Sequence, residues 1–143
     1  MSKISVVYWS GTGNTESMAN AIAKGITDGG KEADCVAVNS ASLIDLQEQP
    51  VFALGCSAMG AEVLEEGEME PFVAEVEKFA SGKQIALFGS YGWGDGQWMR
   101  DWVERMTSAG ATVVDGEGLI CNESPDDEAL TACEALGARL AAL

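Results

Sequence analysis

The chain reads Trp9-Ser10-Gly11-Thr12-Gly13-Asn14-Thr15-Glu16 directly after the apolar run of residues 4–8 and directly before residues 17–23, which carry apolar side chains at helical spacing. The sequence therefore predicts a glycine-rich loop between a buried strand and a helix. The free backbone N–H groups of a helix N-terminus, together with the helix dipole, hold anions. Four short polar side chains, those of Ser10, Thr12, Asn14 and Thr15, add further donors, so we expect this loop to cradle one phosphate.

Two other phosphate-binding motifs do not fit this loop. A P-loop carries a lysine after its second glycine, and no lysine occurs between Lys3 and Lys24. A dinucleotide fingerprint needs a third glycine where this chain has Glu16. The loop therefore favours a terminal monophosphate held by neutral donors. The simpler alternative is a Ser/Gly-rich turn that only caps a helix.

Composition limits the class of protein. At 143 residues and 47% hydrophobic, the chain is expected to form a single domain, 1–143, with a core that needs no disulfides. No apolar run reaches the roughly 20 residues of a membrane span, and the N-terminus lacks the pattern of a signal peptide. We therefore expect a cytoplasmic protein.

The sequence contains no recognisable metal-binding pattern of cysteines and histidines. The chain has no histidine, and no two of its four cysteines are spaced as Cys-x-x-Cys. Zinc and iron–sulfur sites are therefore not expected. The cysteines are interpreted as reduced, mostly buried thiols: Cys35, Cys56, Cys121 and Cys133.

Apolar runs and helical patterns alternate along the chain. Strands are predicted near residues 3–8, 34–38, 51–56, 84–90 and 112–120. Helices are predicted near residues 15–28, 42–47, 70–80, 97–108 and 126–142. Right-handed crossovers place helices on both faces of a parallel sheet, so the pattern indicates an α/β sandwich. Ligands of such sheets bind beyond the carboxyl ends of the strands.

Three blocks at those carboxyl ends resemble short-chain flavodoxins of the clostridial type: residues 8–16, residues 54–60 (Leu-Gly-Cys-Ser-Ala-Met-Gly) and residues 88–96 (Phe-Gly-Ser-Tyr-Gly-Trp-Gly-Asp-Gly). The resemblance implies a flavodoxin-like three-layer α/β/α sandwich with a five-stranded parallel sheet of order 2-1-3-4-5, the standard example of a ligand at a switch point. It also implies a low-potential one-electron carrier with non-covalent FMN, which passes through oxidised, neutral semiquinone and anionic hydroquinone states.

The residues expected to contact FMN follow these blocks and the last loop. They are Trp9, Ser10, Gly11, Thr12, Gly13, Asn14, Thr15, Ser57, Ala58, Met59, Gly60, Ala61, Glu62, Ser90, Tyr91, Gly92, Trp93, Gly94 and Asn122. For Asn122 a helix-start signal is the simpler account. No catalytic residue and no metal ligand is predicted.

The flat ring of a flavin needs two covering side chains. Trp93 and Met59 are expected to cover its faces, with Tyr91 at the border. A core position is the alternative for Trp93, although a tryptophan between two glycines in a loop has little framework to bury it. Trp98 and Trp102 are spaced four apart in a predicted helix and are interpreted as packing residues.

The segment Met59-Gly60-Ala61-Glu62 is expected to tune the redox chemistry. In proteins that it resembles, the peptide after the glycine turns over when the flavin takes up an electron and a proton, and its carbonyl then accepts a hydrogen bond from N5. A type II′ turn suits Gly60, whereas a type II turn would strain Ala61. We hypothesise that Ala61 favours the carbonyl-inward turn by roughly 1 kcal/mol. Glu62 is expected to accept from N3–H; alternatively it is one of a solvated acidic run.

The net charge of −15 has consequences for potential and partners. Carboxylates near an anionic reduced flavin lower its second potential. The same field repels nucleic acid and favours transient encounters of a monomer with basic redox proteins, although acidity alone also confers solubility.

Two other functions are known on folds of this kind. An FMN-dependent NAD(P)H quinone reductase is the alternative on the same fold, but no histidine or basic residue is placed for its chemistry. A phosphorylated receiver needs aspartates after the first and third strands, where this chain has Tyr8-Trp9 and Cys56-Ser57.

Overall fold

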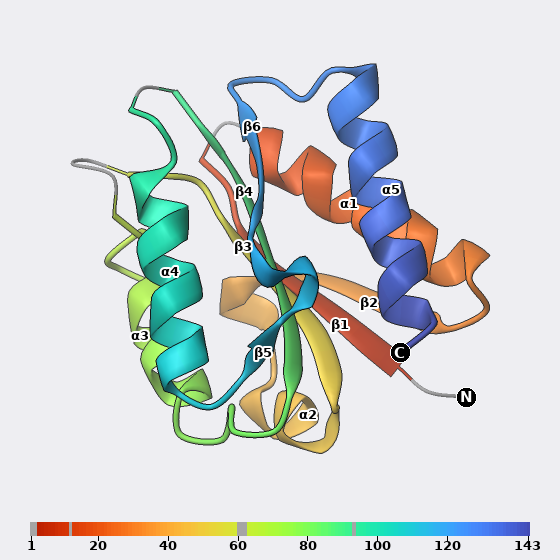
Figure 1. Cartoon of the computed structure of the whole chain (residues 1–143), viewed down its shortest axis with the longest axis vertical. Coiled ribbons are helices and arrows are strands. Elements are labelled where there is room, and N and C mark those ends of the chain that lie inside the picture. Colours follow the sequence, from red (N-terminus) through yellow and green to blue (C-terminus); the bar gives the residue numbers. More distant parts are fainter. Residues whose placement is uncertain (1–2, 12, 60–62, 93) are drawn as a thin grey trace.

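The computed structural model describes residues 3–11, 13–59, 63–92 and 94–143. Its strands are β1 (Lys3–Trp9), β2 (Glu32–Ala37), β3 (Val51–Cys56), β4 (Gln84–Tyr91), β5 (Thr112–Val113) and β6 (Leu119–Asn122). Its helices are α1 (Asn14–Asp28), α2 (Leu43–Glu48), α3 (Met69–Val76), α4 (Gln97–Ser108) and α5 (Asp127–Ala141), with short 3-10 helices η1 (Val38–Ser40) and η2 (Val114–Gly116). Figure 1 shows their arrangement.

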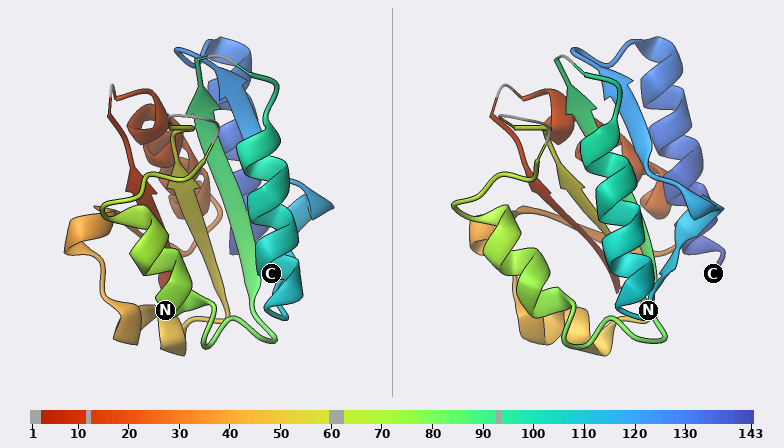
Figure 2. Two further views of the ribbon diagram at one scale, coloured as in Figure 1. Left: turned by 90° about the vertical axis from the view of Figure 1, so that its left-hand side faces the viewer. Right: turned by 60° about the vertical axis from the view of Figure 1, so that its left-hand side comes forward.

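The strands form one parallel sheet of order β2-β1-β3-β4-β5, with β6 also paired to β4. The predicted order 2-1-3-4-5 is confirmed. Because every pairing is parallel, the carboxyl ends of β1, β3, β4 and β6 meet at one rim of the sheet, as the two views of Figure 2 show. The loops that follow these strands therefore lie close together.

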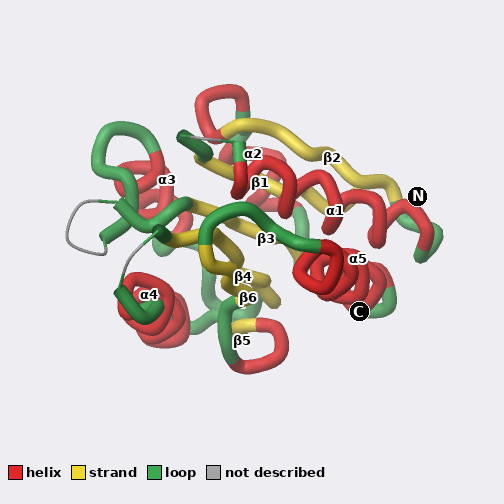
Figure 3. Tube along the Cα trace, turned by 90° about the horizontal axis from the view of Figure 1, so that it is seen from above, coloured by secondary structure: helices red, strands yellow, loops and turns green. Residues whose placement is uncertain are grey.

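Helices cover both faces of the sheet and give the predicted three layers. α1 and α5 lie on one face, and α3 and α4 lie on the other, as seen from above in Figure 3. Each face has its own apolar cluster. Phe52, Leu54 and Trp102 belong to the cluster beneath α3 and α4, and Ile22, Phe88 and Leu140 belong to the cluster beneath α1 and α5.

α1 and α5 cross at two glycines. A Cβ atom at Gly25 would lie 2.0 Å from the carbonyl oxygen of Glu134, and one at Gly137 would lie 2.1 Å from that of Ile22. Only glycine lets the two backbones approach this closely. This contact fixes the C-terminal half of α1 against α5.

Three details differ from the sequence prediction. The strand predicted over residues 112–120 is broken into β5 and β6, because Asp115 adopts a left-handed conformation with φ of 67° that ends the extended backbone. β2 is only partly buried, since it is the edge strand of the sheet. α3 ends at Val76 rather than near residue 80. Trp98 and Trp102 are buried packing residues, as predicted.

No helix within the described parts of the chain is both long and apolar enough to cross a membrane.

Candidate functional site

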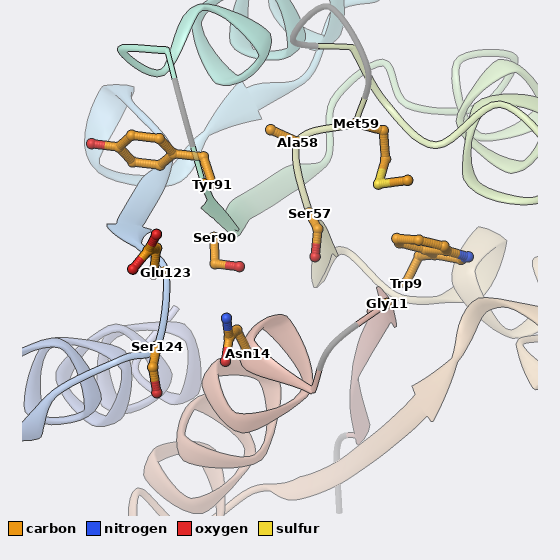
Figure 4. Close-up of a pocket in the computed structure, with 11 residues that line it drawn as sticks. Trp9, Gly11, Asn14, Ser57, Ala58, Met59, Ser90, Tyr91, Glu123 and Ser124 are labelled. Carbon is orange, nitrogen blue, oxygen red and sulfur yellow. The ribbon is translucent and has the colours of Figure 1, made fainter.

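A cleft of about 680 Å³ opens at the rim where β1, β3, β4 and β6 end. This volume falls within the range of about 300–1,000 Å³ that is typical of small-molecule sites. Figure 4 shows the side chains around it. The lining residues are Trp9, Gly11, Asn14, Ser57, Ala58, Met59, Ser90, Tyr91, Gly92, Glu123 and Ser124. Nine of these eleven residues were predicted to contact a cofactor, and all three glycine-rich loops contribute to the wall.

The first loop presents the N-terminus of α1 to the cleft. Gly13 is the N-cap, with φ of 93°, and among the described residues no side chain makes a capping hydrogen bond to this helix start. The first helical hydrogen bond runs from Ser17 N to Gly13 O at 3.0 Å. The N–H groups of Asn14, Thr15 and Glu16 therefore have no acceptor within the helix.

Two other helices of the molecule begin differently. The side chain of Ser42 accepts a hydrogen bond at the start of α2, and that of Asp126 does so at the start of α5. Such caps satisfy the first-turn N–H groups and add an oxygen where an anion would bind. The uncapped start of α1 leaves that space to a ligand.

Ser10 shapes the same loop from within. Its Oγ accepts a hydrogen bond from Gly13 N at 3.0 Å, which still leaves the hydroxyl proton available for donation. Glu16 is the acidic residue in the first turn of α1. Its carboxylate accepts a hydrogen bond from the Tyr8 hydroxyl at 3.2 Å. Burial, helped by this bond to Glu16, raises the pKa of Tyr8. Tyr8 and Glu16 line a second, smaller hollow, which shares Trp9 with the cleft.

Thr15 is predicted to be one of the phosphate donors, and this role stays a prediction. It is fully buried and does not line the cleft. Its Oγ1 lies 2.7 Å from Ser57 Oγ and accepts a hydrogen bond from Ser90 N at 3.3 Å. The sequence could not reveal this, because the bond depends on how close the three loops approach. Thr15 joins the loops together below the cleft.

Apolar side chains form the upper walls. In the view of Figure 4, Trp9 and Met59 come from one side and Tyr91 from the other. Met59 lines the cleft and is 37% exposed, so apolar surface of its side chain is accessible there. The Trp9 ring packs over Gly11, where an added Cβ would lie 3.2 Å from Cη2. The ring centroids of Tyr91 and the buried Trp98 are 5.5 Å apart.

The loop after β6 closes the remaining side. Sequence analysis predicted Asn122 here, but its amide donates to the Tyr91 carbonyl at 3.2 Å and the residue does not line the cleft. The lining residues are Glu123 and Ser124, which sequence analysis missed. The position of their loop, directly after the last predicted strand, could have predicted that Glu123 and Ser124 line the cleft. Glu123 N is held by the same Tyr91 carbonyl at 2.7 Å, and its φ is 56°.

No lysine or arginine is among the described residues that line the cleft. Ion pairs with carboxylates hold Lys3, Lys24, Lys78, Arg100, Arg105 and Arg139. An anion in the cleft would therefore be held by backbone N–H groups and neutral side chains. Among the described residues, no cluster of acidic or cysteine side chains could hold a metal ion.

Several predicted residues do not line the described cleft. Ser10, Gly13 and Gly94 lie in the loops beside it. Five others fall outside the described residues, so their predicted roles stay predictions: Thr12, Gly60, Ala61, Glu62 and Trp93.

Comparison with known proteins gives consistent matches over nearly the whole chain. A family model described as Flavodoxin matches residues 6–137. The chain is 52% identical over 136 residues to a flavodoxin of Clostridium beijerinckii, with 95% of this chain and 97% of that protein covered. It is 42% identical to a flavodoxin of Megasphaera elsdenii, with 94% and 95% covered. The solution structure of two-electron reduced Megasphaera elsdenii flavodoxin superposes with a TM-score of 0.89 at 41% identity, covering 98% of this chain and 99% of that one.

Proposed function

The chain belongs to the flavodoxin family, whose members are electron-transfer proteins that bind FMN, and on that premise we propose that its cleft is the FMN site. The phosphate lies at the uncapped start of α1, and the flavin ring lies between the loops that follow β3 and β4. The single observation that carries this assignment is that the open N-terminus of α1 lies at one end of a mostly apolar cleft.

The described donors fit a terminal phosphate. The first-turn N–H groups of α1, the Asn14 side chain and the Ser10 hydroxyl are grouped at one end of the cleft. The helix dipole favours a dianion there, although no cation lies among the described lining residues. Ser57 and Ser90 line the floor next to this group and suit the hydroxyls of a ribityl chain.

The apolar end fits a planar ring. Met59 lines the cleft and can cover one face of the ring, with Tyr91 at its border, and Trp93 is the second covering residue that the sequence predicts. FMN supplies the one-electron chemistry when bound, and the protein supplies binding, orientation and electrostatics. Met59 and Trp9 exclude water from one side of the ring.

The net negative charge of the protein affects both the reduction potential of the bound flavin and the charge of the partner proteins that it favours. A net charge of −15 disfavours additional negative charge in the cleft, so the protein acts as a low-potential reductant. The acidic surface favours brief encounters with basic redox proteins. We further propose that residues 1–143 are one domain and that the protein is a cytoplasmic monomer.

Paired titrations test the phosphate assignment. The apoprotein is titrated with FMN and with riboflavin, which lacks the phosphate, and flavin fluorescence is followed. Losing two hydrogen bonds to a charged group, at about 1.5 kcal/mol each, weakens binding by about a hundredfold or more. We therefore expect FMN to bind one to one and riboflavin at least about a hundredfold more weakly. Equal affinities would exclude the start of α1 as the phosphate site.

A further inference from the structure

Cys56 is the last residue of β3, and it stands where the flavin-facing loop, residues 57–64, leaves the sheet. Its side chain is fully buried. Its carbonyl oxygen accepts a hydrogen bond from the indole Nε1 of Trp98 at 3.2 Å. This bond ties the end of β3 to α4, so the backbone at the first end of the loop is fixed.

The thiol of the same residue contacts both ends of the loop. The Sγ donates to the carbonyl oxygen of Ser57 at 3.3 Å and accepts from the backbone N–H of Glu65 at 3.4 Å. Ser57 is the first residue of the loop, and Glu65 directly follows its last. The thiol therefore closes the base of the loop from inside the protein.

Glu65 is itself fixed to the start of α3. Its carboxylate accepts hydrogen bonds from Gly67 N and Glu68 N, each at 2.7 Å, and from Met69 N at 3.0 Å. These bonds hold Glu65 to the start of α3, and the N–H group of Glu65 that donates to the Cys56 thiol links this end of the loop to the end of β3.

Above this base, the loop has few supports in its described part. Ala58 N donates to Ser90 O at 3.0 Å. Met59 and Val63 pair across the loop, with N–H···O distances of 2.8 and 2.9 Å. Their side chains are 37% and 42% exposed, so neither is held by the core. The position of Met59 in the cleft therefore depends on the spacing of the two loop ends.

We propose that Cys56 is a positioning residue: its thiol sets the spacing between the ends of the loop 57–64 and thereby the place of Met59 against the flavin. The link to the flavin rests on the proposed function, whereas the link from the thiol to the loop does not. A thiol suits this place because its large sulfur reaches two backbone groups at once. Burial raises the pKa of Cys56 to about 12, so the S–H donor is kept at neutral pH.

Amide hydrogen exchange in the apoprotein tests the proposal directly. The variants are Cys56→Ala and, as a matched control, Cys133→Ala, which removes an equally buried thiol from α5. We expect Cys56→Ala to speed exchange at Met59 and Val63 by at least about threefold relative to Cys133→Ala. These two amides do not touch the thiol, so faster exchange there reports movement of the loop. Unchanged protection at both amides would overturn the proposal.

Two further measurements complete the test. Cys56→Ser keeps a smaller donor and acceptor, so its exchange rates at Met59 and Val63 should lie between those of the native protein and of Cys56→Ala. In the FMN-loaded protein, Cys56→Ala should change the separation of the two one-electron potentials, whereas Cys133→Ala should not. Because exchange is measured without FMN, failure of the FMN assignment would leave that result standing. Equal exchange in Cys56→Ser and Cys56→Ala would contradict a role for the side-chain hydrogen bonds.

Discussion

Thr15 Oγ1 lies 2.7 Å from Ser57 Oγ, so a single hydrogen bond joins the first turn of α1 to the loop that follows β3. The same Thr15 oxygen accepts the backbone N–H of Ser90 at 3.3 Å, at the end of β4. One buried hydroxyl thus connects the three glycine-rich loops below the cleft. The phosphate end and the ring end of the site are held at a fixed separation by this residue.

Thr15→Val should destabilise the apoprotein by about 1 to 3 kcal/mol, because the Ser90 N–H is left buried without its acceptor while the side chain keeps its shape. Thr15→Ser, which retains the hydroxyl, is the control. Urea unfolding measures both free energies. A Thr15→Val protein as stable as Thr15→Ser would show that the shared hydroxyl does not hold the loops.

Gly13→Ala should weaken FMN binding by about tenfold or more, because the left-handed backbone at the α1 N-cap strains and moves the N–H groups around the phosphate. Gly30 offers a matched control: its φ is also 93°, and an added Cβ there, as at Gly13, meets nothing within 4 Å.

Both alanine variants should lose about 1 to 2 kcal/mol of stability. Only Gly13→Ala should lose FMN affinity in a fluorescence titration. A similar loss in Gly30→Ala would assign the effect to general destabilisation.

Glu123→Gln should raise the more negative of the two one-electron potentials. A carboxylate about 10 Å from a reduced flavin costs about 0.4 to 1.7 kcal/mol, which corresponds to about 20 to 70 mV. Glu123 lines the cleft, whereas the control Glu32, at the start of β2, belongs to the opposite end of the sheet. Potentiometry at low salt compares the two Glu→Gln variants, and added salt should reduce the difference. Equal shifts in both would contradict a local effect of Glu123.

Glu65 should make a pH-dependent contribution to stability. Burial opposes its ionisation, but the N–H groups of Met69, Glu68 and Gly67 outweigh burial and lower its pKa. A lowered pKa in the folded state means that the contribution is present above the ordinary carboxyl pKa of about 4.3 and is lost as pH falls through the folded value. Glu65→Gln should therefore destabilise the apoprotein at pH near 7, and the difference should shrink at pH near 3.

The exposed neighbour Glu66 gives the comparison for that experiment. Glu66→Gln should leave the free energy of unfolding nearly unchanged at both pH values. If Glu65→Gln behaved like Glu66→Gln, the capping of α3 by Glu65 would have no energetic weight.

Periodicity and composition were sufficient to predict the order of elements, since buried parallel strands and amphipathic helices have distinct patterns. The break in the last predicted strand did have a signal, because Asp115-Gly116-Glu117-Gly118 interrupts the apolar run and an Asp-Gly pair is typical of a turn. The prediction of one strand over residues 112–120 passed over this signal, and Asp115 adopts the left-handed conformation there. The edge position of β2 explains its partial burial.

For the site, the placement of the loops could be predicted from the sequence, but several contacts between the loops could not. The glycine-rich loops carry a local signal, so their placement at one rim follows from parallel topology. The burial of Thr15 and the entry of Glu123 and Ser124 into the cleft depend on distances between loops that are remote in sequence. The bond from Asn122 to Tyr91 is of the same kind. No pattern along the chain encodes such distances.

Stepwise reduction of the FMN-loaded protein tests the central claim most directly. The purified protein is titrated with dithionite while its visible spectrum is recorded. We predict that the long-wavelength absorption of one-electron-reduced flavin accumulates near the midpoint and disappears on full reduction, with the second electron added at the lower potential. A protein that binds no FMN, or one that passes to full reduction in a single two-electron step, would contradict the account.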